Sequence, residues 1–163
     1  LAMLFEELAV SRGFAMPEIV ATDVCAAALA RARAGRYSQF EIQRGLPMRR
    51  MVTWFDCVDG EWTVRPELAK RVQFRCHNLT RDSAPIGKFD IVLCRNVLLY
   101  FSASVRRSVF DTLRSAMREG GLLVLGAGET VIGQTDAFRP SERFRGFYQA
   151  EPEATTPVRV AAR

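Results

Sequence analysis

Residues 88–125, KFDIVLCRNVLLYFSASVRRSVFDTLRSAMREGGLLVL, decide the class of fold. Residues 88–94 are a short, mostly apolar run that predicts a buried strand, and residues 122–125 are a second run that is apolar on both faces. Between them, residues 104–119 carry apolar side chains about every four positions, which predicts an amphipathic helix. A strand, a helix and a strand in this order predict a parallel βαβ unit.

The same alternation continues toward the amino end of the chain. Residues 17–23 and 72–76 are two further predicted strands, and residues 24–34 are an alanine-rich predicted helix. Gly120 and Gly121 are expected to end the helix of residues 104–119. We therefore predict an α/β fold with a mostly parallel sheet and helices on both of its faces.

One stretch departs from this alternation. Residues 51–65 alternate β-branched and aromatic residues with polar ones on either side of Asp59 and Gly60, a dipeptide that favours a hairpin turn. We expect residues 45–70 to form a small antiparallel β insertion outside the main sheet. Residues 151–163 lack apolar periodicity and are expected to be a loose tail.

Composition limits the class of protein. The chain has 163 residues, of which 48% are hydrophobic and 25% charged, as in one soluble globular domain. It has neither an apolar run long enough for a membrane span nor a signal-peptide pattern, so we expect a cytoplasmic protein without direct membrane insertion. The formal net charge of +5 comes from arginines in runs no longer than two. A solvated basic face is thus favoured over nucleic-acid binding.

Cysteine and histidine usage argues against a metal site. The four cysteines are 32, 19 and 18 residues apart and form no C-x-x-C pair, and His77 is the single histidine. We therefore expect no metal, and reduced cysteines in apolar surroundings. His77 is expected to be a surface or turn residue rather than a general base.

Polar residues follow the predicted strands where each strand ends. Asp23 closes the first strand, Asn78 follows the next, Arg95 and Asn96 follow the third, and residues 126–129 follow the fourth. Ligands of open α/β sheets bind beyond these carboxyl ends, where an acid can accept hydrogen bonds from ribose hydroxyls. The alternatives are a helix N-cap for Asp23 and a turn residue for Asn78.

Several motifs together carry a resemblance to a known family. In chain order they are ATD at 21–23, ARAGRY at 32–37, NL at 78–79, FDIVLCRNVLLYF at 89–101, the strand of residues 121–129 and RGFY at 145–148. In this order they resemble the CheR family, the chemotaxis-receptor glutamate O-methyltransferases that use S-adenosylmethionine. The resemblance covers nearly all of residues 1–150, which it implies form one methyltransferase domain.

The resemblance implies a Rossmann-like class I methyltransferase fold, with the cofactor lying across the strand ends. The catalytic residues that it implies are Tyr100, near the transferring methyl group, and Arg95. The implied cofactor-binding residues are Asp23 at the ribose hydroxyls, Asn78 and Leu79 beside the adenine, and Arg95, Asn96 and Val97 along the methionine portion.

The implied activity is methyl transfer from S-adenosylmethionine to glutamate side chains of bacterial chemoreceptors, leaving S-adenosylhomocysteine. The implied partner is the cytoplasmic helical region of a receptor. A free glutamate has a pKa of ~4.3, so the nucleophile is ionised at neutral pH and no general base is required. The enzyme mainly has to desolvate and align the two reactants.

Two departures from the family pattern bear on activity. The glycine-containing first strand of the family and its amino-terminal helical domain would precede Leu1, and residues 1–10 begin within a helical stripe that has no capping residue. We therefore expect a fragment that lacks the first strand and is inactive alone. The hairpin loop at residues 56–61 is shorter than in members that dock a receptor's carboxy-terminal pentapeptide, which suggests a pentapeptide-independent type.

Two other functions remain as alternatives. Methylation of nucleic acid would suit a basic protein, but the segment at residues 96–100 lacks the proline-containing turn that grips a flipped base. The second alternative is a degenerate, non-catalytic module that senses S-adenosylmethionine or binds a partner protein. The presence of Asp23, Asn96 and Tyr100 argues against degeneration.

Overall fold

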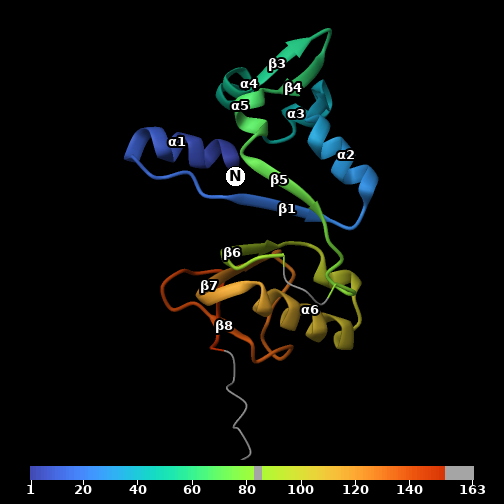
Figure 1. Ribbon diagram of the computed structural model, residues 1–163, viewed down its shortest axis with the longest axis vertical. Coiled ribbons are helices and arrows are strands. Elements are labelled where there is room, and N and C mark those ends of the chain that lie inside the picture. Colours follow the sequence, from blue (N-terminus) through green and yellow to red (C-terminus); the bar gives the residue numbers. More distant parts are fainter. Residues whose placement is uncertain (83–85, 153–163) are drawn as a thin grey trace, which may run out of the picture. The chain divides into compact units, whose positions relative to one another are not determined.

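The computed structural model describes residues 1–82 and 86–152. The chain divides into two compact units, Leu1–Asn78 and Leu79–Arg163, called here the first and second units. Both contain helices and strands, as Figure 1 shows, which confirms the predicted α/β class. The predicted tail falls mostly on residues 153–163, which lie outside the described residues.

The first unit begins with two helices that flank a strand. Both helices end at a glycine in the left-handed region, Gly13 (φ 67°) and Gly35 (φ 60°), where a residue without Cβ is favoured. In chain order the elements are α1 (Ala2–Arg12), β1 (Ile19–Asp23), α2 (Ala26–Ala34), β2 (Arg36–Ser38), α3 (Gln39–Gln43), α4 (Met48–Trp54), β3 (Phe55–Val58), β4 (Glu61–Val64), α5 (Pro66–Ala69) and β5 (Val72–Cys76).

Strands β1 and β5 form the parallel pair of the first unit. Their register runs from Ile19 opposite Val72 to Asp23 opposite Cys76, so both strands end at the same edge. The Arg33 side chain of α2 donates a hydrogen bond of 2.9 Å to a backbone carbonyl of β5, which fastens the helix to the strand. The two strands predicted at this position are thereby confirmed.

The antiparallel part of the first unit has the strand order β2-β4-β3. The predicted hairpin turn is confirmed, because Asp59 (φ 50°) and Gly60 (φ 80°) both adopt positive φ between β3 and β4. Positive φ at both central residues is the geometry of a two-residue turn that matches the twist of its strands. Because β2 pairs with β4, this small sheet also includes Arg36–Ser38, which precede the stretch predicted to form it.

The prediction of strand for residues 51–54 is wrong. These residues form the last part of α4, which begins after Pro47. Trp54 and Phe55 lie three and four positions after Met51, and these three residues pack into one apolar cluster with Ile42. The helical spacing of these residues competes with their β-branched and aromatic composition, and the buried cluster favours the helix.

The second unit is built on a mixed sheet of strand order β6-β7-β9-β8. Strands β6 and β7 are parallel, as the predicted βαβ unit requires, whereas β9 is antiparallel to β7 and to β8, a pairing that the sequence did not predict. In chain order its described elements are β6 (Phe89–Cys94), the 3₁₀ turn η1 (Leu98–Tyr100), α6 (Ala103–Ser115), β7 (Met117–Leu125), β8 (Phe138–Pro140) and β9 (Phe147–Ala150).

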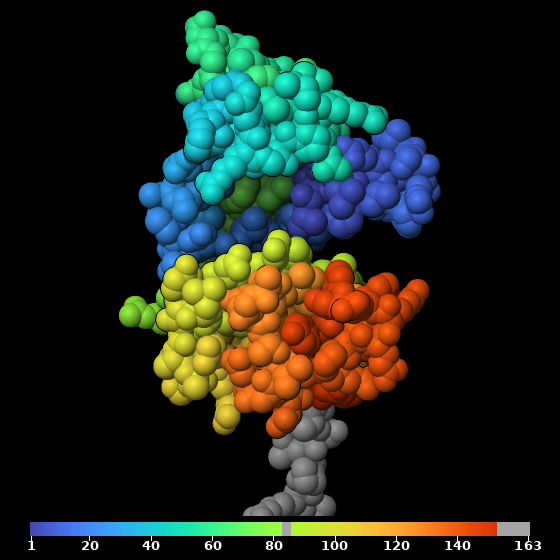
Figure 2. All heavy atoms as spheres, turned by 180° about the vertical axis from the view of Figure 1, so that it is seen from behind, coloured from blue at the N-terminus to red at the C-terminus, as the bar shows by residue number. Residues whose placement is uncertain are grey.

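Helix α6 supplies much of the core of the second unit. Its N-cap residue is Ser102, whose hydroxyl accepts a hydrogen bond from the Val105 N–H. Val109 and Phe110 are fully buried against the sheet, together with Leu123 of β7. Figure 2 shows α6, in yellow, and the segment from β7 to β9, in orange to red, as one packed body.

The predicted end of this helix at Gly120 and Gly121 is wrong. Helix α6 ends at Ser115, and both glycines lie inside β7. A Cβ on Gly121 would come within 3.3 Å of the Asp90 carbonyl oxygen of β6, and Gly120 has φ 71°. The glycines thus permit a close approach of two strand backbones, at the point where the register between β6 and β7 shifts.

The cysteines are free, but the prediction that they lie in apolar surroundings holds only for Cys94. Cys94 is buried at the end of β6, whereas Cys25, Cys57 and Cys76 are exposed. Cys25 and Cys76 lie at the ends of elements, and Cys57 lies on the exposed part of β3, so none of the three reaches a core. In the described part of the chain, no helix has the length and apolarity needed to cross a bilayer.

Candidate functional site

Asp23 lies at the carboxyl end of β1 with an exposed side chain. Its Oδ1 accepts a hydrogen bond of 2.8 Å from the Cys25 N–H, so the carboxylate closes the turn between β1 and α2. Cys25, not Asp23, is the N-cap residue of α2, so the helix-cap alternative is not realised. Among the described residues, no group donates a hydrogen bond to Asp23 Oδ2, which leaves this oxygen available to a ligand.

The end of β5 lies beside Asp23 in the first unit. Cys76 is opposite Asp23 in the ladder, and the His77 N–H donates a hydrogen bond of 3.1 Å to the Asp23 carbonyl oxygen. Asn78 follows directly and is half-buried. The expectation that His77 is a surface residue is wrong, because only 8% of it is exposed.

The remaining predicted residues lie in the second unit, around the end of β6. Arg95 and Asn96 directly follow Cys94 and are exposed, and Asn96 has φ 58°, a left-handed conformation that Asn tolerates better than most residues. Tyr100, at the end of η1, is 79% exposed. We call residues 95–100 the corner. It presents polar side chains at the surface rather than being sealed in the core.

Two of the predicted cofactor-binding residues also have a packing role. Leu79 and Val97 are partly buried and pack against the apolar core of the second unit. Leu98, between Val97 and Tyr100, is 2% exposed and belongs to that core. The apolar residues of the corner thus anchor it, while its polar residues point outward.

Glu129 is a residue bound to this corner that sequence reasoning missed. Its carboxylate is half-buried and accepts hydrogen bonds from backbone N–H groups of two segments. We call residues 96–99 the corner turn. The donors are Asn96 and Gly126 to Oε2, each at 2.8 Å, and Val97, Leu98 and Leu99 to Oε1, at 2.8, 2.7 and 3.4 Å. The sequence signal was an acid shortly after a buried strand, within the strand end at residues 126–129.

This hydrogen bonding sets the protonation state of Glu129. Burial alone would raise the pKa of its carboxyl group, but the hydrogen bonds from Gly126 and from the corner turn outweigh burial and lower the pKa below its ordinary value. The stability that the ionised carboxylate contributes is therefore present above the pKa of the unfolded chain and is lost as pH falls through the lowered pKa. At neutral pH Glu129 is an anion that holds the corner turn.

The neighbouring Cys94 is an inert thiol. Burial, and secondarily the negative charge of Glu129, raise the pKa of Cys94 to about 11. The thiolate is the reactive form, so a thiol with this pKa is not a nucleophile at neutral pH. Burial and the raised pKa therefore argue against Cys94 as a covalent nucleophile.

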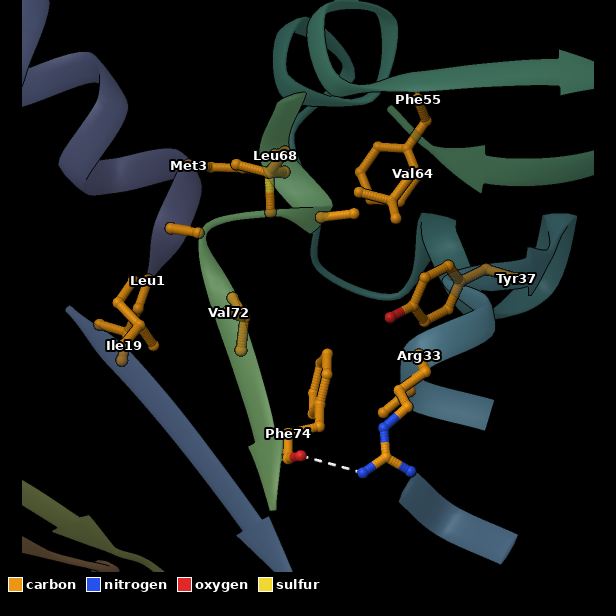
Figure 3. Close-up of a pocket in the computed structure, with 13 residues that line it drawn as sticks. Leu1, Met3, Ile19, Arg33, Tyr37, Phe55, Val64, Leu68, Val72 and Phe74 are labelled. Carbon is orange, nitrogen blue, oxygen red and sulfur yellow. Dashed lines mark hydrogen bonds between the residues drawn. The ribbon is translucent and has the colours of Figure 1, made fainter. Parts of the chain in front are cut away.

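A cavity of about 570 Å³ lies elsewhere in the first unit. Figure 3 shows its mostly apolar lining, which includes Phe55, Val72 and Phe74, with the Tyr37 hydroxyl directed into it. The Arg33 guanidinium, at its border, is engaged with the backbone of Phe74. No candidate residue lines this cavity, so it is separate from the predicted site. Among the described residues, no cluster of metal-ligating side chains occurs either.

Comparison with known proteins gives a consistent assignment. Residues 1–147 match the family described as CheR methyltransferase, SAM binding domain. The chain is 41% identical to chemotaxis protein methyltransferase Cher2 of Pseudomonas putida over 136 residues, which are 82% of this chain and 50% of that protein. It is 42% identical to chemotaxis protein methyltransferase 1 of Pseudomonas aeruginosa over 123 residues, covering 75% of this chain and 45% of that protein.

A third relative agrees with these two. Chemotaxis protein methyltransferase 1 of Vibrio cholerae is 40% identical over 141 residues, or 85% of this chain and 51% of that protein. The chain thus spans about half the length of the curated relatives that it matches. The matched residues include the end of β1, with Asp23, and the segment that follows β6, with residues 95–100. The chain belongs to the CheR methyltransferase family, in the part described as the SAM-binding domain, and it has the Rossmann-like α/β fold expected of it.

Proposed function

We propose that the full-length protein transfers a methyl group from S-adenosylmethionine to glutamate side chains of chemoreceptors in the cytoplasm. The observation that carries this proposal is the family match over residues 1–147, which spans all of the candidate residues. Relatives named chemotaxis protein methyltransferase at about 40% identity support the same activity. The proposed partner is the helical cytoplasmic region of a receptor.

The residues present are chemically suited to the cofactor. Asp23 offers a carboxylate oxygen without a hydrogen-bond donor among the described residues, and a ribose diol requires such an acceptor. Arg95 and Asn96 are exposed polar groups at the other strand end, suited to an amino acid moiety. A buried Asp23 carboxylate with all of its oxygens hydrogen-bonded, or Arg95 and Asn96 packed in the core, would have argued against cofactor binding by these residues.

We assign roles to these residues accordingly. Asp23 binds the ribose hydroxyls. Asn78 and Leu79 border the adenine, for which Leu79 provides an apolar surface. Arg95, Asn96 and Val97 border the methionine portion, and Tyr100, with Arg95, lies at the reacting centre.

The chemistry makes modest demands on these side chains. The bound cofactor supplies an electrophilic methyl group on a positively charged sulfur. The glutamate acceptor is already ionised at neutral pH, so the protein does not need a base, and His77 is buried and unsuited to that role. What remains for the protein's residues is to bind, to exclude water and to hold the acceptor in line with the methyl group.

Methylation of a receptor fragment tests the proposal. Incubating the full-length protein with isotopically labelled S-adenosylmethionine and the cytoplasmic fragment of a chemoreceptor should give alkali-labile label, as expected of a methyl ester. Peptide mapping should locate it on glutamates, and a receptor with those glutamates changed to glutamine should remain unlabelled. Removing the receptor's carboxy-terminal pentapeptide should leave the rate unchanged. Label on nucleic acid, or binding of the cofactor without transfer, would contradict the proposal.

Tyr100→Phe separates a reacting-centre role from a binding role. If the exposed Tyr100 hydroxyl acts on the reacting groups, its removal should lower kcat about tenfold and change the affinity for S-adenosylhomocysteine less than about twofold. Receptor methylation rates and calorimetric titration measure the two quantities. Tyr37→Phe removes a hydroxyl at the separate cavity and should change neither. A loss confined to affinity would remove Tyr100 from the reacting centre.

A further inference from the structure

The corner turn and the segment after β7 are joined through one side chain. Glu129 accepts hydrogen bonds from the N–H groups of residues about 30 positions earlier in the chain as well as from Gly126, three positions earlier. In the residues that the structure describes, no other carboxylate accepts hydrogen bonds from so many backbone N–H groups. These contacts lie entirely within the second unit.

The corner turn needs such a partner. The N–H groups of Leu98 and Leu99 open the short 3₁₀ turn η1, so they have no acceptor inside it, and backbone donors without a partner are costly. Asn96 adopts a positive φ, which must be maintained by its surroundings. Hydrogen bonds to a charged acceptor are stronger than neutral ones, so one carboxylate fixes the whole turn.

Gly126 shows how closely the two segments fit. A Cβ on Gly126 would lie 2.4 Å from Asn96 Oδ1 and 2.8 Å from Glu129 Oε2. The Cβ would also lie 2.9 Å from the Asn96 backbone nitrogen, so a larger residue at this position would force the two segments apart. The Asn96 side chain therefore lies close against Gly126, and the Asn96 N–H donates a hydrogen bond to Glu129.

We infer that Glu129 is a positioning residue for cofactor binding, which holds the backbone of the corner turn so that Arg95, Asn96 and Val97 are preorganised for the methionine portion. The inference rests on the proposed function, because that function assigns the turn to the cofactor. Glu129 acts through the turn and need not touch the ligand. Preorganisation of this kind lowers the cost of binding rather than adding contacts.

Glu129→Gln in the full-length protein tests this inference. The amide keeps one acceptor oxygen, but its NH2 group cannot accept, so part of the set of backbone donors loses its partner. We expect the affinity for S-adenosylhomocysteine to fall about tenfold and the KM for S-adenosylmethionine to rise in parallel, with kcat changed less than about threefold. Glu142→Gln removes the same charge from an exposed position of the second unit and should leave both constants unchanged.

Two further measurements separate positioning from plain stability. In Glu129→Ala, added formate or acetate should restore part of the lost affinity, because a small carboxylate fits the backbone donors that Glu129 leaves. Gly126→Ala keeps the carboxylate but crowds the turn, and should weaken binding by a similar factor. Affinity is measured well below the melting temperature, with the binding stoichiometry giving the folded fraction, so that a variant that folds poorly is recognised.

The outcomes are distinguishable. A lower melting temperature with unchanged affinity in both Glu129→Gln and Gly126→Ala would make Glu129 a structural residue only and overturn the inference alone. Failure of the wild-type protein to bind S-adenosylhomocysteine would overturn the proposed function and this inference with it. Weaker binding with carboxylate rescue would support the positioning role.

Discussion

Asp23→Ala in the full-length protein is expected to weaken binding of S-adenosylhomocysteine about 5- to 150-fold, or ~1–3 kcal/mol. The reason is the loss of an acceptor for ribose hydroxyls that would be shielded from water in the complex. The carboxylate is exposed at the end of β1, and within the described part of the chain its Oδ2 has no donor of its own. Calorimetric titration gives the affinity directly.

Asp23→Asn is the matched control, because Asp23 also accepts a hydrogen bond from Cys25. Asparagine retains one oxygen for the Cys25 N–H and thus the turn into α2, but it offers an NH2 group where the ribose needs an acceptor. If Asp23 binds the ribose, both variants should lose affinity. A loss seen in alanine but not in asparagine would assign Asp23 to the turn alone.

Phe110→Ala is expected to lower the free energy of unfolding of the second unit by about 3–5 kcal/mol. Phe110 is 0% exposed at the centre of the core beneath α6, and its ring centroid is 6.1 Å from that of Phe138. Removing the ring loses its burial and leaves a cavity that close-packed neighbours fill only in part. Amide hydrogen exchange in α6 and β7 measures this change within the full-length protein.

Phe40→Ala provides the comparison for this prediction. Phe40 lies on α3 with 77% of its surface exposed, so its removal should change stability by less than about 0.5 kcal/mol. The two variants delete the same ring from opposite environments. If both variants changed the free energy of unfolding by the same small amount, the core of the second unit would not depend on Phe110.

The elements with one dominant pattern were predictable from the sequence. Residues 88–94 and 122–125 are apolar runs bounded by polar residues, and both form strands of a parallel pair. The pattern failed where two structures compete for the same residues. Met51 and Trp54 have the composition of a strand and the spacing of a helix, and burial in a shared cluster decided between them.

Glycine was the other source of error. A glycine pair after a helical stripe is usually a helix end, but Gly121 is required by the backbone of β6, a partner that the local sequence does not reveal. The same limit applies to the site. Asp23 and Asn96 were chosen as candidates because strand ends are recognisable. Glu129 also follows a strand, but its hydrogen bonds to the backbone of residues about 30 positions earlier cannot be inferred from the local sequence.

The distribution of the thiols has a practical consequence. Cys25, Cys57 and Cys76 are exposed in the first unit, while Cys94, the cysteine of the second unit, is buried with its pKa raised to about 11. A maleimide dye or spin label will therefore react with the first unit and not with the second. In this chain, the label therefore reports on the first unit, and Cys94 does not have to be replaced to keep it out of the second.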